Sequence, residues 1–394
     1  MLQIKDRIYS VGVQNADLRV FDIIMRTPKG TSYNAYLVKG HEKSALVETV
    51  KDGFDESYFR SIEEIMPISD IDYVVLNHTE PDHAGIITLL LDKNPDIKVL
   101  GSNSAIQFIA HIINRPFNGQ AVKKGDSIDL GGRSLSFYPM PNLHWPDTMF
   151  TYDSLTGALF TCDYLGAHFS WPALFYSSMT DVQKEEYEEG LRAYYLDIMS
   201  PFAQPFVTNG IKAIRELAPT AILTGHGAVL DENLDHFYDL YEKWAQKAPK
   251  SGKTVAIPYV SAYGYTQTLA NAIAQTLKDE GLVVKLVEVS DHKAEALAAV
   301  EEADGVLFGS PTFLGDVLQP IGELLSALHP YQMKGKPAAA FGSYGWSGEA
   351  VGFITQRLDQ LKAKTVEGFR ARMNPSREEL AGAREFARNF ARML

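Results

Sequence analysis

The strongest constraint on the fold of this chain is a change of pattern near residue 250. A polar, lysine-bearing segment from Glu242 to Lys253 separates two regions in which apolar runs are arranged differently. We interpret this segment as the end of a helix followed by a linker that contains Pro, Ser and Gly. The chain has 394 residues, whereas a single hydrophobic core stops growing at about 250–300 residues. The sequence therefore predicts two domains, residues 1–250 and residues 251–394.

Before this segment, short apolar runs end repeatedly in clusters of polar residues. The runs lie at residues 44–49, 71–76, 96–101, 134–140, 149–153, 158–163 and 220–225, and residues 102–113 have a helical pattern. Apolar runs of this length, bounded by polar residues, are typical of buried strands. Strand-rich stretches with interspersed helices favour an α/β fold of the αβ/βα sandwich type.

After the segment, strands and helices alternate strictly. Strands are predicted at residues 254–260, 283–289, 305–310 and 338–343, and helices from about Thr266, at residues 293–303, up to His329, from Glu349 and from about Ser376. This alternation is typical of βαβ units. The C-terminal region is therefore predicted to form a doubly wound parallel sheet.

Charge and cysteine content exclude several classes of function. The net charge of −12 and the isoelectric point near 5.3 argue against a nucleic-acid or anionic-membrane partner, because both require a basic surface. The single cysteine, Cys162, excludes a disulfide within the chain and a cysteine-ligated zinc or iron–sulfur site. The chain shows no signal-peptide run and no apolar run of the roughly 20 residues that span a membrane. We therefore expect a soluble, cytoplasmic protein.

A dense group of metal-binding residue types follows the predicted strand at residues 71–76. It is the run His78-Thr79-Glu80-Pro81-Asp82-His83. Three more candidates also stand directly after predicted strands or in the loop that follows one, where a rigid scaffold presents side chains. The seven candidate ligands are His78, Glu80, Asp82, His83, His144, Asp163 and His226, and His168 could line the same pocket. The alternative interpretation of the first run is a polar loop that caps a helix.

The chemistry of these side chains limits the metal. Histidine and carboxylate without thiolate suit iron, manganese or zinc. Seven ligand groups are too many for one tetrahedral zinc. The sequence therefore predicts two ions, and carboxylate-rich pairs are the usual setting for two irons, since a carboxylate can bridge them.

Three loops in the C-terminal region carry the second set of candidates. Each follows a predicted strand, and an open doubly wound sheet binds ligands at that end of its strands. The first loop also opens a helix, whose N-terminus binds anions such as phosphate. Tyr344 or Trp346 could cover the face of a flavin ring. The candidate flavin-binding residues are Ser261, Ala262, Tyr263, Gly264, Tyr265, Thr266, Ser310, Pro311, Thr312, Phe313, Leu314, Gly315, Ser343, Tyr344, Gly345, Trp346, Ser347 and Gly348.

The two sets of residues resemble one known family. The N-terminal set is similar to the metal signature of the metallo-β-lactamase fold, but the hydrolytic members usually carry HxHxDH, and this chain has Glu80 at the third motif position. That HxExDH variant, followed by a flavodoxin-like FMN module, resembles the flavodiiron proteins over nearly the whole chain. The resemblance implies that one iron takes His78, Glu80 and His144, that the other takes Asp82, His83 and His226, and that Asp163 bridges them.

The resemblance also implies a function. Electrons from an external donor would pass through FMN to the diiron site, which would reduce O2 to water, NO to N2O, or both. No CxxC pair follows the FMN module, so we expect a separate donor: rubredoxin, a flavoreductase or a reduced deazaflavin. A head-to-tail homodimer or a dimer of dimers is expected, with Tyr194 or Tyr195 as a possible proton donor near the metals.

Two other functions remain open from the sequence. One is a di-zinc hydrolase in which the flavin domain is regulatory, which Glu80 argues against. The other is a flavin-based redox sensor that binds a partner.

Overall fold

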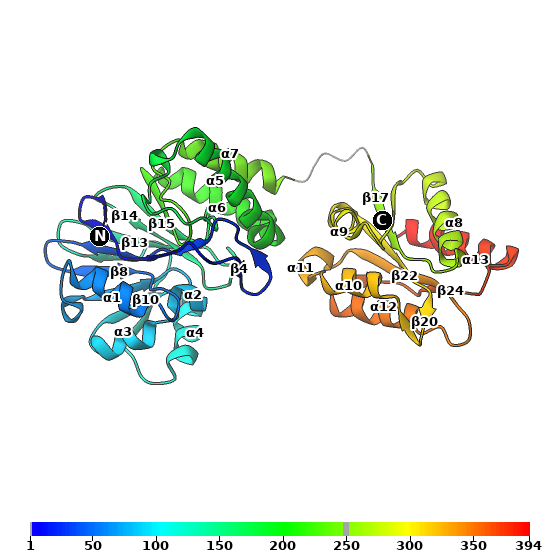
Figure 1. Cartoon of the computed structure of the whole chain (residues 1–394), viewed down its shortest axis with the longest axis horizontal. Coiled ribbons are helices and arrows are strands. Elements are labelled where there is room, and N and C mark those ends of the chain that lie inside the picture. The colour runs from blue at the N-terminus through cyan, green and yellow to red at the C-terminus, as the bar shows by residue number, and fades with distance from the viewer. Residues whose placement is uncertain (1, 247–251) are drawn as a thin grey trace. The chain divides into compact units, whose positions relative to one another are not determined.

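The computed structural model describes residues 2–246 and 252–394. The chain divides into two compact units, Met1–Gln246 and Lys247–Leu394. Figure 1 draws the first in blue to green and the second in yellow-green to red. The domain boundary expected after residue 250 and most of the expected linker lie outside the described residues.

The N-terminal unit contains two large sheets. The first has the strand order β1 (Leu2–Lys5), β2 (Ile8–Ser10), β7 (Tyr36–Lys39), β8 (Ser44–Val47), β9 (Tyr73–Leu76), β10 (Lys98–Gly101) and β11 (Gly119–Ala121). The second has the order β12 (Ser127–Asp129), β13 (Ser134–Pro139), β14 (Met149–Asp153), β15 (Ala158–Cys162) and β16 (Ala221–Thr224). The strands predicted in this half are confirmed within one or two residues at each end.

Apolar side chains fix the layers of this unit. Val47 and Val75 from the first sheet and Phe137 and Leu223 from the second share one core between the sheets. The outer face of the first sheet packs on α1 (Asp55–Glu63), α3 (Ile87–Lys93) and α4 (Asn103–Ile113). The outer face of the second sheet packs on α5 (Asp181–Tyr194), α6 (Thr208–Leu217) and α7 (Leu234–Ala245). These four layers form the predicted αβ/βα sandwich.

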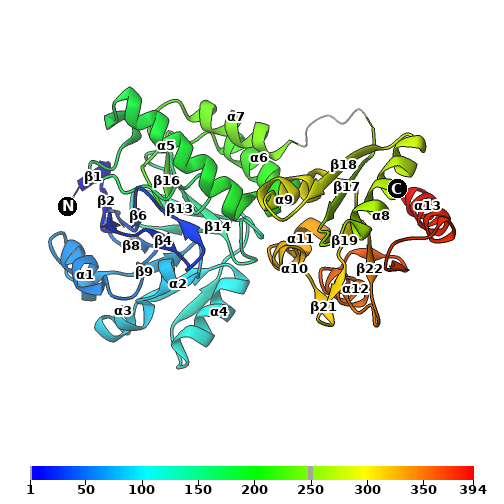
Figure 2. The ribbon, with the colours of Figure 1, turned by 45° about the vertical axis from the view of Figure 1, so that its right-hand side comes forward.

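The C-terminal unit is built on a parallel sheet. Its strand order is β18 (Val283–Glu288), β17 (Thr254–Tyr259), β19 (Gly305–Gly309), β22 (Pro337–Tyr344) and β23 (Lys364–Thr365), and β24 (Phe369–Arg372) also pairs with β22. One face packs on α8 (Tyr265–Asp279) and α13 (Arg377–Ala391), and the other on α9 (Lys293–Glu302), α10 (Gln319–Ser326) and α12 (Ala350–Gln360), as Figure 2 shows. The doubly wound sheet is confirmed.

Two details of the predicted C-terminal pattern are wrong. The helix expected to reach His329 ends at Ser326, and a separate short helix, α11 (Pro330–Met333), follows. Pro330 explains the break, because proline lacks an N–H and disfavours helical backbone at the residue before it. The alternation is also not strict, since a hairpin of β20 (Thr312–Phe313) and β21 (Asp316–Val317) follows β19.

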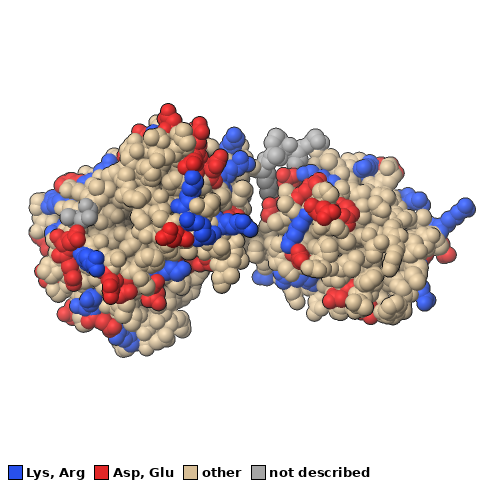
Figure 3. Space-filling model, in the orientation of Figure 1, with Lys and Arg blue, Asp and Glu red and all other residues tan. Residues whose placement is uncertain are grey.

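The surface of each unit carries charged side chains of both signs, as the sequence composition leads one to expect. Acidic and basic side chains are interspersed on the face of each unit drawn in Figure 3. Among the described residues, no helix is both long and apolar enough to cross a membrane.

Candidate metal centre and flavin cleft

The seven predicted ligands come together in the N-terminal unit, beyond the ends of four strands. His78 and Glu80 follow β9, and His144, Asp163 and His226 follow β13, β15 and β16. Asp82 and His83 lie on the short helix α2 (Pro81–Ala84), which begins with Pro81 at its first position. Proline suits that position because its fixed φ matches the helix and its missing N–H needs no partner there. The turn thereby brings Glu80, Asp82 and His83 into the same cluster as His78.

The first group of ligand atoms surrounds Glu80. Atoms of His78, Glu80, His144 and Asp163 lie within 4.8 Å of one another. Glu80 Oε2 is 3.1 Å from His78 Nε2 and 3.2 Å from His144 Nε2. Asp163 Oδ2 is 3.1 Å from His144 Nε2. Two imidazoles and two carboxylates therefore converge on one point.

The second group consists of Asp82, His83 and His226. Asp82 Oδ2 is 3.0 Å from His226 Nε2 and 3.3 Å from His83 Nε2. The other carboxylate oxygen of Asp163, Oδ1, is 2.8 Å from His83 Nε2 and 3.5 Å from His226 Nε2. Asp163 thus offers Oδ2 to the first group and Oδ1 to the second, which is the position of a bridging ligand.

The buried carboxylates of the cluster need positive charge beside them. Burial alone would raise the pKa of Asp163, but neighbouring histidines, His83 first, hold that pKa well below its ordinary value. Burial likewise lowers the pKa of His83, but Asp82 and Asp163 outweigh it and raise the pKa to about 10. Among the described residues, the ion-pair partners of the cluster's carboxylates are all histidines. Neutral histidines would leave these buried carboxylates without compensation.

Unpaired atoms indicate what supplies that charge. Asp82 Oδ1 and His83 Nε2 are buried without a hydrogen-bond partner among the described residues, although His83 Nε2 lies 2.8 Å from Asp163 Oδ1. Ligand atoms that converge on a metal position, rather than on one another, are left without hydrogen-bond partners in this way. By contrast, the buried pair Arg133–Asp153 forms two hydrogen bonds of 2.9 and 2.7 Å and needs no further partner. The cluster fits two divalent cations, because their ligands would be deprotonated and convergent.

Outer contacts hold two of the histidines in place. His78 Nδ1 is 3.2 Å from Asp147 Oδ2, which also accepts hydrogen bonds from Thr79. His226 donates from Nδ1 to the carbonyl oxygen of Ser32 at 2.5 Å. The sequence analysis missed Asp147 and Ser32. Asp147 stands three residues after His144, which was the available signal, whereas nothing in the sequence indicates Ser32.

Further side chains line the second group. His168 lies 5.1 Å from His226 and 4.8 Å from Tyr194 between ring centroids, and its Nδ1 is 3.0 Å from Thr31 Oγ1. His168 Nε2 and the Tyr194 hydroxyl are buried without a partner among the described residues. Tyr195 packs instead against Tyr241 and Trp244. Of the two expected tyrosines, Tyr194 is the one beside the metal cluster.

The three flavin loops of the C-terminal unit meet around a cleft of about 370 Å³. It is lined by Ala262, Tyr263, Tyr265, Pro311, Thr312, Phe313, Leu314, Ser343, Tyr344, Gly345, Trp346 and Met373. The sequence analysis missed Met373, which reaches the cleft because its N–H bonds to the carbonyl oxygen of Tyr344 across the β22–β24 edge. The cleft is mainly aromatic and apolar, as a planar ring system requires.

Seven predicted flavin residues do not line this cleft: Ser261, Gly264, Thr266, Ser310, Gly315, Ser347 and Gly348. Several of them shape the loops instead. Ser261 Oγ accepts a hydrogen bond from the Gln267 N–H in the first turn of α8, and Thr266 bonds to Ser343 at 2.9 Å. Gly264 has φ +82°, a backbone conformation that favours glycine, directly before α8.

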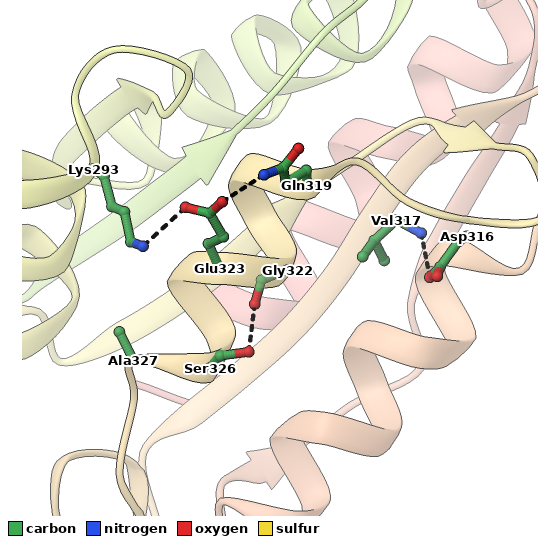
Figure 4. Close-up of a pocket in the computed structure, with 8 residues that line it drawn as sticks. All are labelled: Lys293, Asp316, Val317, Gln319, Gly322, Glu323, Ser326 and Ala327. Atoms are coloured by element: carbon green, nitrogen blue, oxygen red, sulfur yellow. Dashed lines mark hydrogen bonds and ion pairs between the residues drawn. The ribbon is translucent and has the colours of Figure 1, made fainter. Parts of the chain in front are cut away.

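A second hollow in this unit, drawn in Figure 4, is a poorer candidate for a cofactor. It has a volume of about 670 Å³ and lies between Lys293 and the hairpin residues Asp316 and Val317. Its charged groups already have partners, since Glu323 accepts from Lys293 at 3.0 Å and from Gln319 at 2.7 Å. The aromatic cleft is therefore the better candidate for the flavin.

Comparison with known proteins agrees with this division. The family model for ODP family beta lactamases matches residues 31–227, and the flavodoxin model matches residues 257–386. The flavo-diiron protein FprA2 of Clostridium acetobutylicum is 39% identical over 401 residues, covering 100% of this chain and 99% of the relative. The anaerobic nitric oxide reductase flavorubredoxin of Aeromonas hydrophila is 34% identical, covering 99% of this chain and 79% of the relative.

A solved structure extends the likeness to the fold of the whole chain. The rubredoxin oxygen:oxidoreductase of Desulfovibrio gigas superposes with a TM-score of 0.72 at 27% sequence identity, covering 99% of this chain and 98% of that one. Both domain folds expected from the sequence are thereby confirmed. The chain belongs to the family of flavodiiron proteins.

Proposed function

We propose that this protein is an oxidoreductase that passes electrons from a separate donor through FMN to a diiron site, where O2 is reduced to water, NO to N2O, or both. One observation carries the proposal: a buried histidine–carboxylate cluster with Glu80 in place of a histidine occurs in the same chain as an aromatic flavin cleft. Relatives named for nitric oxide reduction and for oxygen reduction both align over nearly the whole chain. The choice between O2 and NO stays open.

The metal assignment follows the two groups of the cluster. One iron would be held by His78, Glu80 and His144 and the second by Asp82, His83 and His226, and Asp163, which contacts both groups, would serve both ions. Bound iron and FMN supply the redox chemistry, while the protein supplies position, charge and protons. The carboxylate-rich set stabilises the more oxidised, more highly charged metal better than an all-histidine set, which is why Glu80 favours an oxidoreductase over a zinc hydrolase.

The chain's own residues prepare the site. Asp147 and the Ser32 carbonyl orient His78 and His226 through their Nδ1 atoms, as outer partners of metal-binding histidines usually do. Five of the seven ligands are buried, while the side chains of Glu80 and His144 are 17% and 15% exposed. The Tyr194 hydroxyl holds a proton beside His168, since burial raises the pKa of Tyr194 well above its ordinary value. We propose Tyr194, whose ring centroid lies 5.9 Å from that of His226, as a proton donor near the second group.

The flavin site uses a different set of contacts. We propose that the N-terminus of α8 and the loop before it bind the FMN phosphate. Trp346 and Tyr344 contribute aromatic faces to the cleft, and we propose that one of them covers the isoalloxazine ring. Of the 18 loop residues predicted from the sequence, 11 line the cleft together with Met373, and we keep the other seven as a prediction.

The partners are proposed on the same basis. The electron donor is a rubredoxin, a flavoreductase or a reduced deazaflavin, and a cytoplasmic location remains a prediction from the sequence. We propose a head-to-tail homodimer or a dimer of dimers, in which the FMN of one chain serves the iron pair of another. A twofold dimer is the commonest closed assembly.

Stopped-flow oxidation tests the proposed function. The protein is reduced anaerobically and mixed separately with O2 and with NO. We expect FMN to be reoxidised within the turnover time by at least one of the two gases. Protein that contains zinc alone after expression in iron-rich medium, and whose reduced flavin reacts no faster than free FMNH2, would refute the proposal.

A further inference from the structure

Glu48 is a buried acid that the assignments above do not use. It follows β8 directly, as the predicted ligands follow their strands, and it is 2% exposed. Its φ of +65° is unusual for a residue other than glycine and carries a conformational cost. The backbone around it is held by hydrogen bonds from its N–H to Val75 O and from the Tyr58 hydroxyl to its carbonyl oxygen. The fold therefore places this carboxyl group at a fixed point.

The carboxyl group of Glu48 lies beside His83. Oε1 accepts the N–H of Asn77 at 2.8 Å, whereas Oε2 is buried without a partner among the described residues. Single ligand atoms of Glu48, His83 and Cys162 lie within 4.8 Å of one another. His83 Nε2 is turned to Asp82 and Asp163, so Nδ1 is the ring nitrogen left over, and it too has no partner. Two buried polar groups without partners thus occupy the same small region.

Two other buried histidines of the cluster show which hydrogen bond His83 lacks. His78 uses Nδ1 to contact the carboxylate of Asp147, and His226 uses Nδ1 to contact the carbonyl of Ser32. Metal-binding histidines almost always donate the second ring N–H to such an acceptor, which fixes the tautomer and the ring orientation. His83 is equally buried but has no such acceptor among the contacts described above. Glu48 is the carboxylate that the fold holds next to it.

We propose that Glu48 is a positioning residue for His83: with a divalent cation in the Asp82/His83/His226 group, Oε2 of Glu48 accepts the Nδ1–H of His83 and keeps Nε2 directed at the cation. Burial raises the pKa of Glu48 to about 8, and a cation held by the neighbouring ligands would favour its ionised form. The contact would pair both unpartnered atoms at once. The inference rests on the proposed metal site, and it assigns to Glu48 a role that acts only through His83.

Glu48→Gln provides a sharp test, because it keeps the shape of the side chain. The amide oxygen of the new side chain must accept the hydrogen bond of the Asn77 N–H, so its NH2 group faces His83 and cannot accept a hydrogen bond from Nδ1–H. We expect anaerobic Fe2+ titration of metal-free protein to show two tight sites in the wild type. In Glu48→Gln, one of them should weaken about 10- to 100-fold, as is typical for loss of such an outer partner. Unchanged binding of both ions by Glu48→Gln would overturn the inference.

A double-mutant cycle separates positioning from general damage. If Glu48 acts through His83, combining Glu48→Gln with His83→Gln should weaken Fe2+ binding no further than His83→Gln alone. Independent, additive losses would contradict the inference. Asp147→Asn is the matched control: its effect should arise at His78 and should add to that of Glu48→Gln.

Cys162→Ser tests the competing interpretation of the same three side chains. Glu48, His83 and Cys162 could themselves hold a third cation. We expect the wild type and Cys162→Ser to bind two Fe2+ ions per chain with equal affinity. A third ion in the wild type that is lost in both Cys162→Ser and Glu48→Gln would replace the positioning role by a metal site. A wild type that binds no iron tightly would refute the proposed function itself.

A spectroscopic measurement keeps the inference testable even if a variant fails to fold. In wild-type protein loaded with diamagnetic Zn2+ and labelled with 15N-histidine, NMR reports which ring nitrogen carries the proton. We expect His83 to carry it on Nδ1, in slow exchange with water. His83 with an unprotonated Nδ1 would contradict the inference.

Discussion

The two cofactor sites of this chain differ in burial and in chemistry. In the metal cluster, His78 and His83 are 0% exposed and Asp163 is 2% exposed. At the flavin cleft, Trp346 is 81% exposed and Leu314 is 90% exposed. The cluster consists of ionisable groups at strand ends of two packed sheets, whereas the cleft consists of aromatic and apolar side chains on three loops. Most of the predicted metal ligands are thus held in the core, whereas residues that line the proposed flavin cleft are exposed.

This difference has a physical reason. Metal ligands must point at one centre within a few tenths of an ångström, and only a packed scaffold with outer hydrogen bonds holds them there. A flavin is recognised through area and stacking, which loops can provide, and its ring must remain accessible to an electron donor. We therefore expect changes in the cluster to abolish activity without loss of FMN, and changes in the cleft to weaken FMN binding without loss of metal.

The largest effect is expected for Asp163→Asn. An amide is a poor bridge, and this residue contacts both groups of the cluster. Turnover with O2 or NO should fall more than about 100-fold, beyond the range typical of outer-sphere changes, while FMN content stays at one per chain. His168→Asn is the control with a smaller loss, because His168 belongs to neither group. Equal losses at the two positions would undermine the bridging role.

Glu80→His converts the motif to the form found in hydrolases. Imidazole suits zinc, and removing the carboxylate removes charge that stabilises ferric iron. We expect loss of turnover, more zinc relative to iron by elemental analysis, and normal FMN content. A variant that keeps full turnover with O2 would show that Glu80 is not a metal ligand.

Mixing two inactive variants tests whether the two sites cooperate across chains. Asp163→Ala should keep its FMN. Gly345→Val combined with Gly348→Val should lose FMN, since Gly348 has φ +85° and lies against the Tyr344 ring, but should keep its metals. In a head-to-tail dimer one of the two site pairs is intact, so about half of the wild-type activity should return per mixed dimer.

Two controls are needed for the mixing experiment. Mixed dimers must be verified, and their activity must not fall on dilution, because collisions between separate dimers could mimic rescue. Verified mixed dimers that stay inactive would refute transfer between chains.

The smallest effect is expected for Trp346→Ala. An aromatic stacking contact contributes about 0.5–1.5 kcal/mol, so FMN affinity should fall by about 2- to 12-fold, with iron content unchanged. Phe353→Ala is a suitable control on the same unit, since Phe353 is exposed and does not line the cleft. Fluorescence titration of the flavin-free protein measures both affinities. Equal FMN affinity of Trp346→Ala and wild type would remove Trp346 from the site.

The two regions were also predictable to different degrees. Each predicted ligand stands at or just beyond the end of a short apolar strand, so residue type and local pattern were enough to find the seven side chains that the structure brings together. Glu48 likewise stands directly after a strand, β8. A single acid without other metal-binding residue types beside it forms no recognisable motif, however. Ser32 acts through its backbone carbonyl, which no side-chain pattern can indicate.

Other features depend on tertiary structure that the sequence pattern does not contain. The strands before residue 44, such as β2 and β7, are short and lack a clear alternation, so they were not predicted. Met373 reaches the flavin cleft only through pairing of β24 with β22. The hydrogen bonds of the Thr266 and Ser310 hydroxyls to Ser343 and to the Pro311 carbonyl could not be predicted from the sequence either.

Cofactor content of the anaerobically purified protein tests the central claim most directly. The claim is that one chain holds a buried pair of iron ions in one unit and one flavin in the other. Elemental analysis and flavin quantification of the same sample should give close to two Fe and one FMN per chain, and Asp163→Asn should lower only the first number. Zinc in place of iron, or iron that persists unchanged in Asp163→Asn, would contradict the account.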